Sequence, residues 1–497
     1  MKSRTMENML RNRAAGAVIA LLAALLVSCG GSPSSSTMPG TAKAMFATGA
    51  ITGFGSVHLN GKKFDTSHAK IMVNGQTGAQ SDLVVGEIVE VKAHHDDGSD
   101  ADVADEVDFR TNVRGPLQAI DPSPPTDPAT LHVLVVLGQT VLISADTSFG
   151  GGILPASVAG LANGDILEVS GYPLANGDIV AMRVNRKPAG TSFEVLGALS
   201  QTNLAAKTFQ INALVVDYSA SSLQNFPNGA PADGLLVEVN GAALGAQNQL
   251  LASQLEAISN QETHADVNDD AEYEGPVTRY ASVTDFDVAG LKVTTGAATV
   301  FENGTAADLA TIGVRVEVEG AIDSAGILEA TKIQFEHSAN VRIRAQVDAV
   351  DLTASPNTVT VLGVKIAVTD LTRFEDEGAD HVSTFSLSDL QKLTWIEVRA
   401  SQSPPGSNQL LANRIERLET QSQVELGGPV TVVALPQLTI LRIPVDATGA
   451  LFFDASGTST TAAGFFSGLV GQYATVKGAW NGTTLVATSA SLSNEWD

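Results

Sequence analysis

The sequence of 497 residues contains a single cysteine, Cys29, and only 5% aromatic residues. A lone cysteine excludes a disulfide within the chain, and it leaves no set of thiolates to hold a structural metal ion. Only 17% of the residues are charged, yet the formal net charge is −25. A negative field of this size repels phosphate backbones, so we expect no nucleic-acid partner.

The chain also lacks the motifs that mark common catalytic sites. We find no G-x-S-x-G nucleophile elbow, no H-E-x-x-H metal-binding helix and no phosphate-binding loop before a helix. The eight histidines are scattered along the sequence, and no glycosidase-like pair of carboxylates can be picked out. We therefore predict no catalytic residue, no cofactor and no metal ion, and we expect that the protein is not an enzyme.

The one long apolar run lies near the N-terminus, where residues 14–27 follow a basic segment. This run is too short to span a membrane comfortably and is typical of a secretory signal. It ends in Leu26-Val27-Ser28-Cys29, which resembles the lipobox of bacterial lipoproteins. The resemblance implies a signal peptide over residues 1–28 and a lipid on Cys29, where two or more acyl chains give a stable anchor. An ordinary secretory signal with a chance cysteine is the alternative.

A Gly/Ser/Pro-rich linker follows over residues 29–45. Such a composition forms a flexible spacer that would lift the first folded domain from the bilayer. The lipoprotein resemblance also implies a sorting position at Gly30, where a residue other than Asp suggests the outer membrane. We expect a lipid-anchored protein of the cell envelope, and its exposure on the periplasmic or the surface face stays open.

One alternating stretch recurs six times and organises the rest of the chain. Its clearest copy is LATIGVRVEVEG at residues 309–320, in which valines alternate with charged residues. This period of two predicts a half-buried β-strand. The central polar position recurs at intervals of 78, 70, 79, 80 and 78 residues and is occupied by Glu90, Glu168, Glu238, Glu317, Glu397 and Thr475. A period this regular, and longer than the roughly 20–50 residues of solenoid repeats, predicts tandem domains that each have their own core.

Most copies are preceded by a short strand and a Gly-containing hairpin, and most are followed by a closing strand. Short strands joined by Gly-rich turns predict an all-β fold. We place an acidic linker at residues 261–272 and barrel-like domains at residues 46–110 (repeat 1), 113–187 (repeat 2), 193–258 (repeat 3), 273–337 (repeat 4), 341–418 (repeat 5) and 424–493 (repeat 6). Repeat 5 also holds a candidate short helix over residues 381–393, with Ser386 as its cap and Asp389 as the capping-box acid.

The order of these elements resembles a bacterial repeat family catalogued as domain of unknown function 5666. The resemblance rests on a G-x-[VLI] opening strand, a [VF]-x-[VI]-x-G hairpin, an L-x-x-G-x-x-V-E-V-x-G strand and an L-x-A-x-x-[VI] closing strand. It extends over nearly all of residues 46–493, is best in repeats 2, 4 and 5, and is weakest in repeats 1 and 6. The resemblance implies tandem OB-like β-barrels and an envelope location, and it implies no enzyme activity.

The repeated glutamate is the first candidate for a ligand-binding position that several repeats share. Alternation places it opposite the apolar face, and therefore on the solvent side of each strand. Basic residues in the closing strands predict the cross-strand pairs Glu168–Arg183, Glu317–Lys332 and Glu397–Arg414. Each such pair would contribute roughly 0.2–1 kcal/mol, and we favour this structural role over a ligand face.

Two acidic segments could hold metal ions. The denser comprises His94, His95, Asp96, Asp97, Asp100, Asp102, Asp105 and Glu106. Adjacent histidines in a strand point to opposite faces, so we expect an acidic hairpin there rather than a metal site. Residues 266–270 match the start of a calcium loop, but Ala271 and Val277 stand where its Gly and Glu belong, which favours a solvated linker.

These patterns predict a non-catalytic, multivalent module that binds or supports an envelope polysaccharide or protein, with weak contacts that add through effective concentration. One alternative is a periplasmic or surface enzyme with a single specialised repeat, either in the Pro-rich segment 121–130 or in the long loop of repeat 5. Another is weak binding of divalent cations by the acidic surface. An enzyme would show one pocket with perturbed titratable groups, whereas a binding module would show the same face in several repeats. The ligand and the oligomeric state stay open.

Overall fold

The computed structural model describes residues 43–95, 101–121, 130–258, 265–378, 381–403 and 407–492. Outside these ranges lie the predicted signal peptide (residues 1–28), Cys29, Asp96, Asp97, Asp100 and the Pro-rich residues 122–129. The described residues are nearly all in strands and turns, with one α-helix, α1 (Ala462–Phe466), which confirms the all-β fold class. No helix in these ranges is long and apolar enough to cross a membrane.

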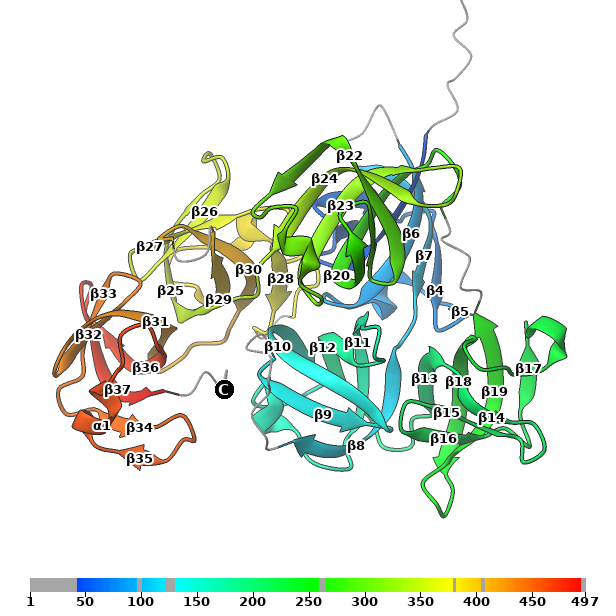
Figure 1. Cartoon of the computed structure of the whole chain (residues 1–497). Coiled ribbons are helices and arrows are strands. Elements are labelled where there is room, and N and C mark those ends of the chain that lie inside the picture. Colours follow the sequence, from blue (N-terminus) through cyan, green and yellow to red (C-terminus); the bar gives the residue numbers. More distant parts are fainter. Residues whose placement is uncertain are drawn as a thin grey trace, which may run out of the picture. The chain divides into compact units, whose positions relative to one another are not determined.

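Repeat 4, drawn in green in Figure 1, illustrates the plan of the barrel. Its ring runs through β20 (Asp270–Ser282), β21 (Asp285–Val288), β22 (Leu291–Glu302), β24 (Leu328–Glu336) and β23 (Arg315–Ile322), and β23 pairs again with β20. Neighbouring strands are antiparallel except β22 and β24, which are parallel. A closed ring of five strands is the plan of small OB-like barrels, so this prediction is confirmed.

The same ring closes in three other repeats. In repeat 2 it comprises β8 (Val113–Asp121), β9 (His132–Val136), β10 (Gln139–Gly150), β12 (Ile179–Lys187) and β11 (Ile166–Pro173). In repeat 5 it comprises β25 (Val341–Asp351), β26 (Asn357–Val361), β27 (Val364–Val368), β30 (Leu410–Arg417) and β29 (Trp395–Gln402), with β28 (Arg373–Asp376) added on β30. In repeat 6 it comprises β31 (Val424–Ala434), β32 (Gln437–Ile440), β33 (Ile443–Asp446), β37 (Leu485–Ser491) and β36 (Tyr473–Trp480), with β34 (Leu451–Phe453) and β35 (Ser459–Thr460) added.

Repeats 1 and 3 follow the same strand order with small breaks. Repeat 1 is built from β1 (Ala44–Ala50), β6 (Ile88–His94), β7 (Asp102–Phe109), β3 (Lys62–Asp65) and β2 (Val57–Leu59), with β4 (Lys70–Val73) on β7 and β5 (Gln76–Thr77) on β4. Repeat 3 is built from β13 (Phe193–Ala198), β18 (Leu236–Leu244), β19 (Leu250–Ile258), β16 (Leu214–Asp217), β15 (Thr208–Ile211) and β14 (Ser200–Asn203), with β17 (Ser222–Gln224) on β19. β1 begins at Ala44 and β20 at Asp270, so both strands start inside segments that the sequence assigned to linkers.

The six repeats are joined in pairs by strand pairing. β1 pairs with β20, β8 with β13, and β25 with β31, which links repeats 1 and 4, 2 and 3, and 5 and 6. One apolar core runs through repeats 2 and 3, and another through repeats 5 and 6. The prediction that each repeat has its own core is therefore wrong for repeats 2, 3, 5 and 6, whereas the buried apolar residues of repeats 1 and 4 form two separate clusters. The N-terminal half of each opening strand forms hydrogen bonds along one edge with a strand of its own barrel. Its other edge pairs with the opening strand of the neighbouring repeat.

The predicted helix in repeat 5 is reduced to a single 3-10 turn, η5 (Leu387–Asp389). The capping interaction is present, since the Ser386 N–H donates to the Asp389 carboxylate at 2.8 Å. The backbone has positive φ at His381 (44°) and at Leu393 (73°), which interrupts a right-handed helix at both ends of the segment. Short turns occupy the same place in other repeats: η1 (Gln80–Asp82), η2 (Val158–Gly160), η3 (Pro227–Gly229) and η4 (Asp308–Ala310).

Candidate functional site

Four of the repeated glutamates are buried, so the prediction that they face solvent is wrong. No more than 6% of the surface is exposed in any of Glu168, Glu238, Glu317 and Glu397, whereas Glu90 and Thr475 are half-buried. Alternation does set these side chains opposite the barrel core. That second face is covered by other parts of the chain, and so each carboxyl group needs either a partner for its charge or a bound proton inside the protein.

Between repeats 2 and 3, one arginine contacts a carboxylate of each repeat. Arg114 Nη1 lies 3.1 Å from Oε2 of the repeated Glu168, and Arg114 Nη2 lies 2.7 Å from Oε2 of Glu194 in repeat 3. Lys187 Nζ approaches the other oxygen of Glu168 at 2.7 Å. Burial is the main influence on Glu194 and raises its pKa to about 8, although Arg114 acts in the opposite direction. Burial and the ion pair with Arg114 therefore act in opposite directions on this carboxyl group.

The interface of repeats 5 and 6 has the same arrangement. Arg344 Nη2 lies 2.7 Å from Oε2 of the repeated Glu397, and Arg344 Nη1 lies 3.5 Å from Oε2 of Glu425 in repeat 6. Arg342 bridges the same two carboxylates at 2.9 Å each. We call the two arrangements, Glu168–Arg114–Glu194 and Glu397–Arg344–Glu425, the inter-repeat clamps.

Repeats 1 and 4 are joined by different polar contacts. Lys62 of β3 forms an ion pair with Glu272 of β20, and the Ala50 N–H donates to Glu274 Oε2 at 2.9 Å. Burial raises the pKa of Glu272 to about 7, and the ion pair with Lys62 opposes this rise. All three pairs of repeats thus place a buried carboxylate at the shared edge of the sheet.

Only one of the three predicted cross-strand pairs forms an ion pair. Arg414 Nη2 lies 3.6 Å from Glu397 Oε1. Glu168 is opposite Asn185, and Glu317 is opposite Gln334. Arg183 and Lys332 pair instead with Glu375 and Glu319, respectively. The bulge that follows each repeated glutamate shifts the strand register, and alternation alone gives no sign of it.

A buried ion pair and a hydrogen bond connect repeat 2 with repeat 5, and a second ion pair lies within repeat 5 beside them. Arg183 Nη1 lies 2.9 Å from Glu375 Oε2, and Arg414 Nη1 lies 3.6 Å from Glu375 Oε1. Burial alone would raise the pKa of Glu375, but the surrounding arginines, Arg414 foremost, hold this pKa at about 2. Arg399 Nη1 donates to the carbonyl oxygen of Ala145 at 2.6 Å. Glu375 of β28 and Arg399 of β29 therefore act as contacts between repeats 2 and 5.

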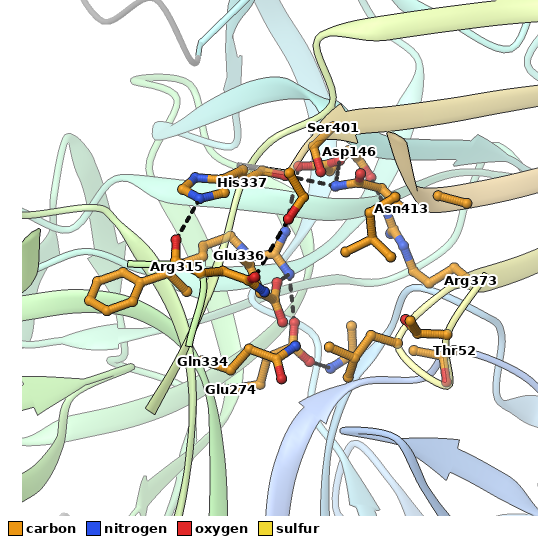
Figure 2. Close-up of a pocket in the computed structure, with 18 residues that line it drawn as sticks. Thr52, Asp146, Glu274, Arg315, Gln334, Glu336, His337, Arg373, Ser401 and Asn413 are labelled. Atoms are coloured by element: carbon orange, nitrogen blue, oxygen red, sulfur yellow. Dashed lines mark hydrogen bonds and ion pairs between the residues drawn. The ribbon is translucent and has the colours of Figure 1, made fainter. Parts of the chain in front are cut away.

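A cavity of about 60 Å³ lies within this junction and is lined by residues of repeats 1, 2, 4 and 5 (Figure 2). Arg315 lies 2.6 Å from Glu274, 2.5 Å from Glu336 and 3.5 Å from Asp146. Burial raises the pKa of Glu336 to about 7, and Arg315 counteracts that rise. The space suffices for a few water molecules. Because it is this small and its charges contact one another, the cavity fits a hydrated part of the junction better than a substrate site.

The candidate metal ligands lie apart from this junction. His94 Nδ1 is 3.1 Å from Asp105 Oδ2, and His95 Nδ1 is 2.6 Å from Asp102 Oδ1, so the two histidines contact different carboxylates. In the calcium-loop-like segment, the Asp266 N–H donates to the Asp269 carboxylate at 2.7 Å and closes a turn. Across the described ranges, no three side chains of His, Cys, Asp or Glu are grouped as a metal site.

The partners of the repeated glutamates are not among the residues that the sequence patterns predict. Arg114 and Arg344 stand at the same place in the opening strands RGPLQAI and RAQVDAV. The carboxylates Glu194 and Glu425 belong to the opening strands of the next repeats. A charged residue that recurs in an otherwise apolar opening strand was the available signal.

A comparison with family models finds four matches to the Domain of unknown function (DUF5666), at residues 48–108, 114–185, 274–334 and 344–416, which together cover more than half of the chain. The chain belongs to the DUF5666 family. The DUF5666 matches confirm the resemblance for repeats 1, 2, 4 and 5, whereas repeats 3 and 6 lie outside the matched segments. No curated protein matches the sequence. Among solved structures, a chain described as Drosophila Unr CSD456 is 11% identical, with a TM-score of 0.13, over 46% of this DUF5666 protein and 98% of that chain.

Proposed function

We propose that this DUF5666 protein is a non-catalytic binding or structural module of the cell envelope, anchored to the outer membrane by a lipid on Cys29. The observation that carries the proposal is the inter-repeat clamp. In each clamp, the polar residue that recurs along the chain contacts an arginine that also contacts the next repeat, which favours a role in joining barrels over a role in chemistry. Barrels joined in this way present several outer faces together, and weak contacts on these faces add through effective concentration.

The anchor is supported by the sequence before the first barrel. An apolar segment ends at Cys29, and a Gly/Ser/Pro-rich stretch leads from there to β1. Cys29→Ser should move the protein from the membrane fraction to the soluble fraction, because the thiol that would carry the lipid is lost. Ser32→Ala in the linker is the matched control and should leave the distribution unchanged. Retention of the Cys29→Ser protein in membranes would contradict the anchor.

The binding role is tested with envelope fractions. The mature chain is immobilised beside a fragment of repeats 5 and 6, residues 341–492, which share one core. Both are exposed to polysaccharide and protein fractions of the envelope. We expect the whole chain to retain a component more strongly than the fragment does. Equal retention would contradict multivalent binding, and turnover of a substrate by either protein would overturn the non-catalytic role.

A further inference from the structure

A second hollow, apart from the junction cavity, lies between repeats 1 and 3. Its volume of about 410 Å³ falls in the range of roughly 300–1,000 Å³ that small-ligand sites occupy. The β4, β6 and β7 strands of repeat 1 form one wall, and β17 and β19 of repeat 3 contribute the other. We call this hollow the 1–3 cleft.

The wall from repeat 1 carries charges of both signs in register. Glu106 of β7 lies opposite Lys70 on one side and opposite Lys92 on the other. Lys70 Nζ is 3.0 Å from Glu106 Oε1. In the next row, Asp108 lies opposite Glu90. Residues two apart in a strand share a face, so these side chains form one polar surface along the cleft.

The wall from repeat 3 adds amide groups, and an arginine forms ion pairs with carboxylates of both repeats. Gln254 and Glu256 stand two apart on β19, beside Gln224 of β17. Arg110 Nε lies 3.1 Å from Asp108 Oδ2 of repeat 1, and Arg110 Nη1 lies 2.8 Å from Glu238 Oε2 of repeat 3. The repeated glutamate of repeat 3 therefore helps to set the width of the cleft.

One acceptor in the cleft has no partner within the described ranges. Asp108 Oδ1 is buried and accepts no hydrogen bond there, whereas Oδ2 contacts Arg110. A buried acceptor without a donor is costly, which favours a donor supplied by water or by a ligand. A ligand hydroxyl would meet this need without adding charge beside Glu90.

The lining restricts the chemistry of the ligand. Among the described residues of the lining, Met72 is the one large apolar side chain and none is aromatic, which disfavours an apolar ligand. Four carboxylates disfavour phosphates, and three cationic groups disfavour polyamines. Carboxylates accept hydrogen bonds, ammonium and guanidinium groups donate them, and glutamine amides do both. A neutral ligand with many hydroxyl groups matches this mixture.

We propose that the 1–3 cleft binds a neutral saccharide unit of a carbohydrate chain through the side chains of Asp108, Gln224 and Gln254. This inference rests on the proposed binding role and gives that role a ligand class, but it does not depend on the lipid anchor. The proposed site is also distinct from the clamps, because the ligand would lie between repeats 1 and 3, whose described strands belong to different sheets.

The test is isothermal titration calorimetry of the mature chain with maltotriose, cellotriose and triacetylchitotriose, with inorganic phosphate as the charged comparison. At least one trisaccharide should bind and phosphate should not. Gln254→Leu and Gln224→Leu each remove a donor and an acceptor from the cleft and should weaken binding about tenfold. Gln437→Leu, at an exposed glutamine of β32 in repeat 6, is the matched control and should bind like the unaltered chain.

Two outcomes would overturn the proposal. One is the absence of binding with all three trisaccharides, and the other is equal binding by the cleft variants and the control. Neither outcome decides the proposed function, because the chain could retain envelope components through another face. Conversely, trisaccharide binding by a chain that retains no envelope fraction would support the 1–3 cleft and contradict the wider role.

Discussion

Replacement of Glu397 by Gln tests what the clamp contributes to stability. Glu397 is 2% exposed and lies within 3.6 Å of four guanidinium groups, those of Arg342, Arg344, Arg399 and Arg414. Burial would raise its pKa, but these arginines, Arg342 foremost, hold the pKa well below the usual range. The carboxylate is therefore ionised in the folded chain, and its loss leaves buried positive charge without its main partner.

The expected loss of stability depends on which ion pairs the arginines keep when Glu397 is replaced. Removal of one member of a buried ion pair costs about 3–5 kcal/mol. Arg342 keeps Glu425 at 2.9 Å, and Arg414 keeps Glu416 at 2.7 Å. We therefore expect Glu397→Gln to lower the free energy of unfolding by about 3 kcal/mol, near the lower end of that range.

Tryptophan fluorescence during urea unfolding measures the free energy of unfolding of this part of the chain, because Trp395 and Trp480 lie in repeats 5 and 6. Glu419→Gln, at an exposed position after β30, is the matched control and should change the free energy by no more than about 0.5 kcal/mol. An equal loss in both variants would refute the reasoning, because the buried charges would then contribute no more than a surface charge.

Three further predictions concern single positions. Burial above all raises the pKa of Glu317 to about 9. The free energy of unfolding should therefore fall as the pH rises from the pKa of Glu317 in the unfolded chain to this value, by up to about 1.4 kcal/mol per pH unit. Glu317→Gln should make this fall less steep in urea titrations followed by circular dichroism. Leu393 has a φ of 73° at the position where repeat 4 has Gly313 with a φ of 91°. Leu393→Gly should raise the free energy of unfolding by roughly 0.5–1 kcal/mol, because the backbone strain that it removes exceeds the conformational entropy that it adds to the unfolded chain. A lower urea midpoint would contradict this prediction. A Cβ at Gly320 would lie 2.1 Å from the carbonyl oxygen of Glu329; Gly320→Ala should therefore cost about 1–3 kcal/mol in thermal unfolding, and an unchanged midpoint would contradict the close approach.

The strands and the barrel plan could be predicted because alternation and turn residues are local signals. The residues 309–320 become a turn followed by β23, and Asn60-Gly61 forms the tight turn between β2 and β3 with φ of 52° and 72°. Near-constant spacing of the repeated glutamate gave the number of barrels. These features depend on residues close together in the sequence.

The environment of the outer face could not be predicted from alternation. Glu317 and Glu319 occupy equivalent places in the pattern, yet Glu317 is buried and Glu319 is partly exposed beside Lys332. The difference depends on which repeat covers which strand. Repeat 1 pairs with repeat 4 rather than with repeat 2, and such contacts between distant segments leave no periodic trace in the sequence.

Amide hydrogen exchange in a Glu168→Gln variant tests most directly whether the clamps couple neighbouring repeats. Glu168 lies in β11 of repeat 2, and its partner Arg114 also holds Glu194 of β13 in repeat 3. Loss of the charge should raise exchange in β13 (Phe193–Ala198) as well as in β11 (Ile166–Pro173). Faster exchange confined to β11, with β13 protected as in the unaltered chain, would contradict the account.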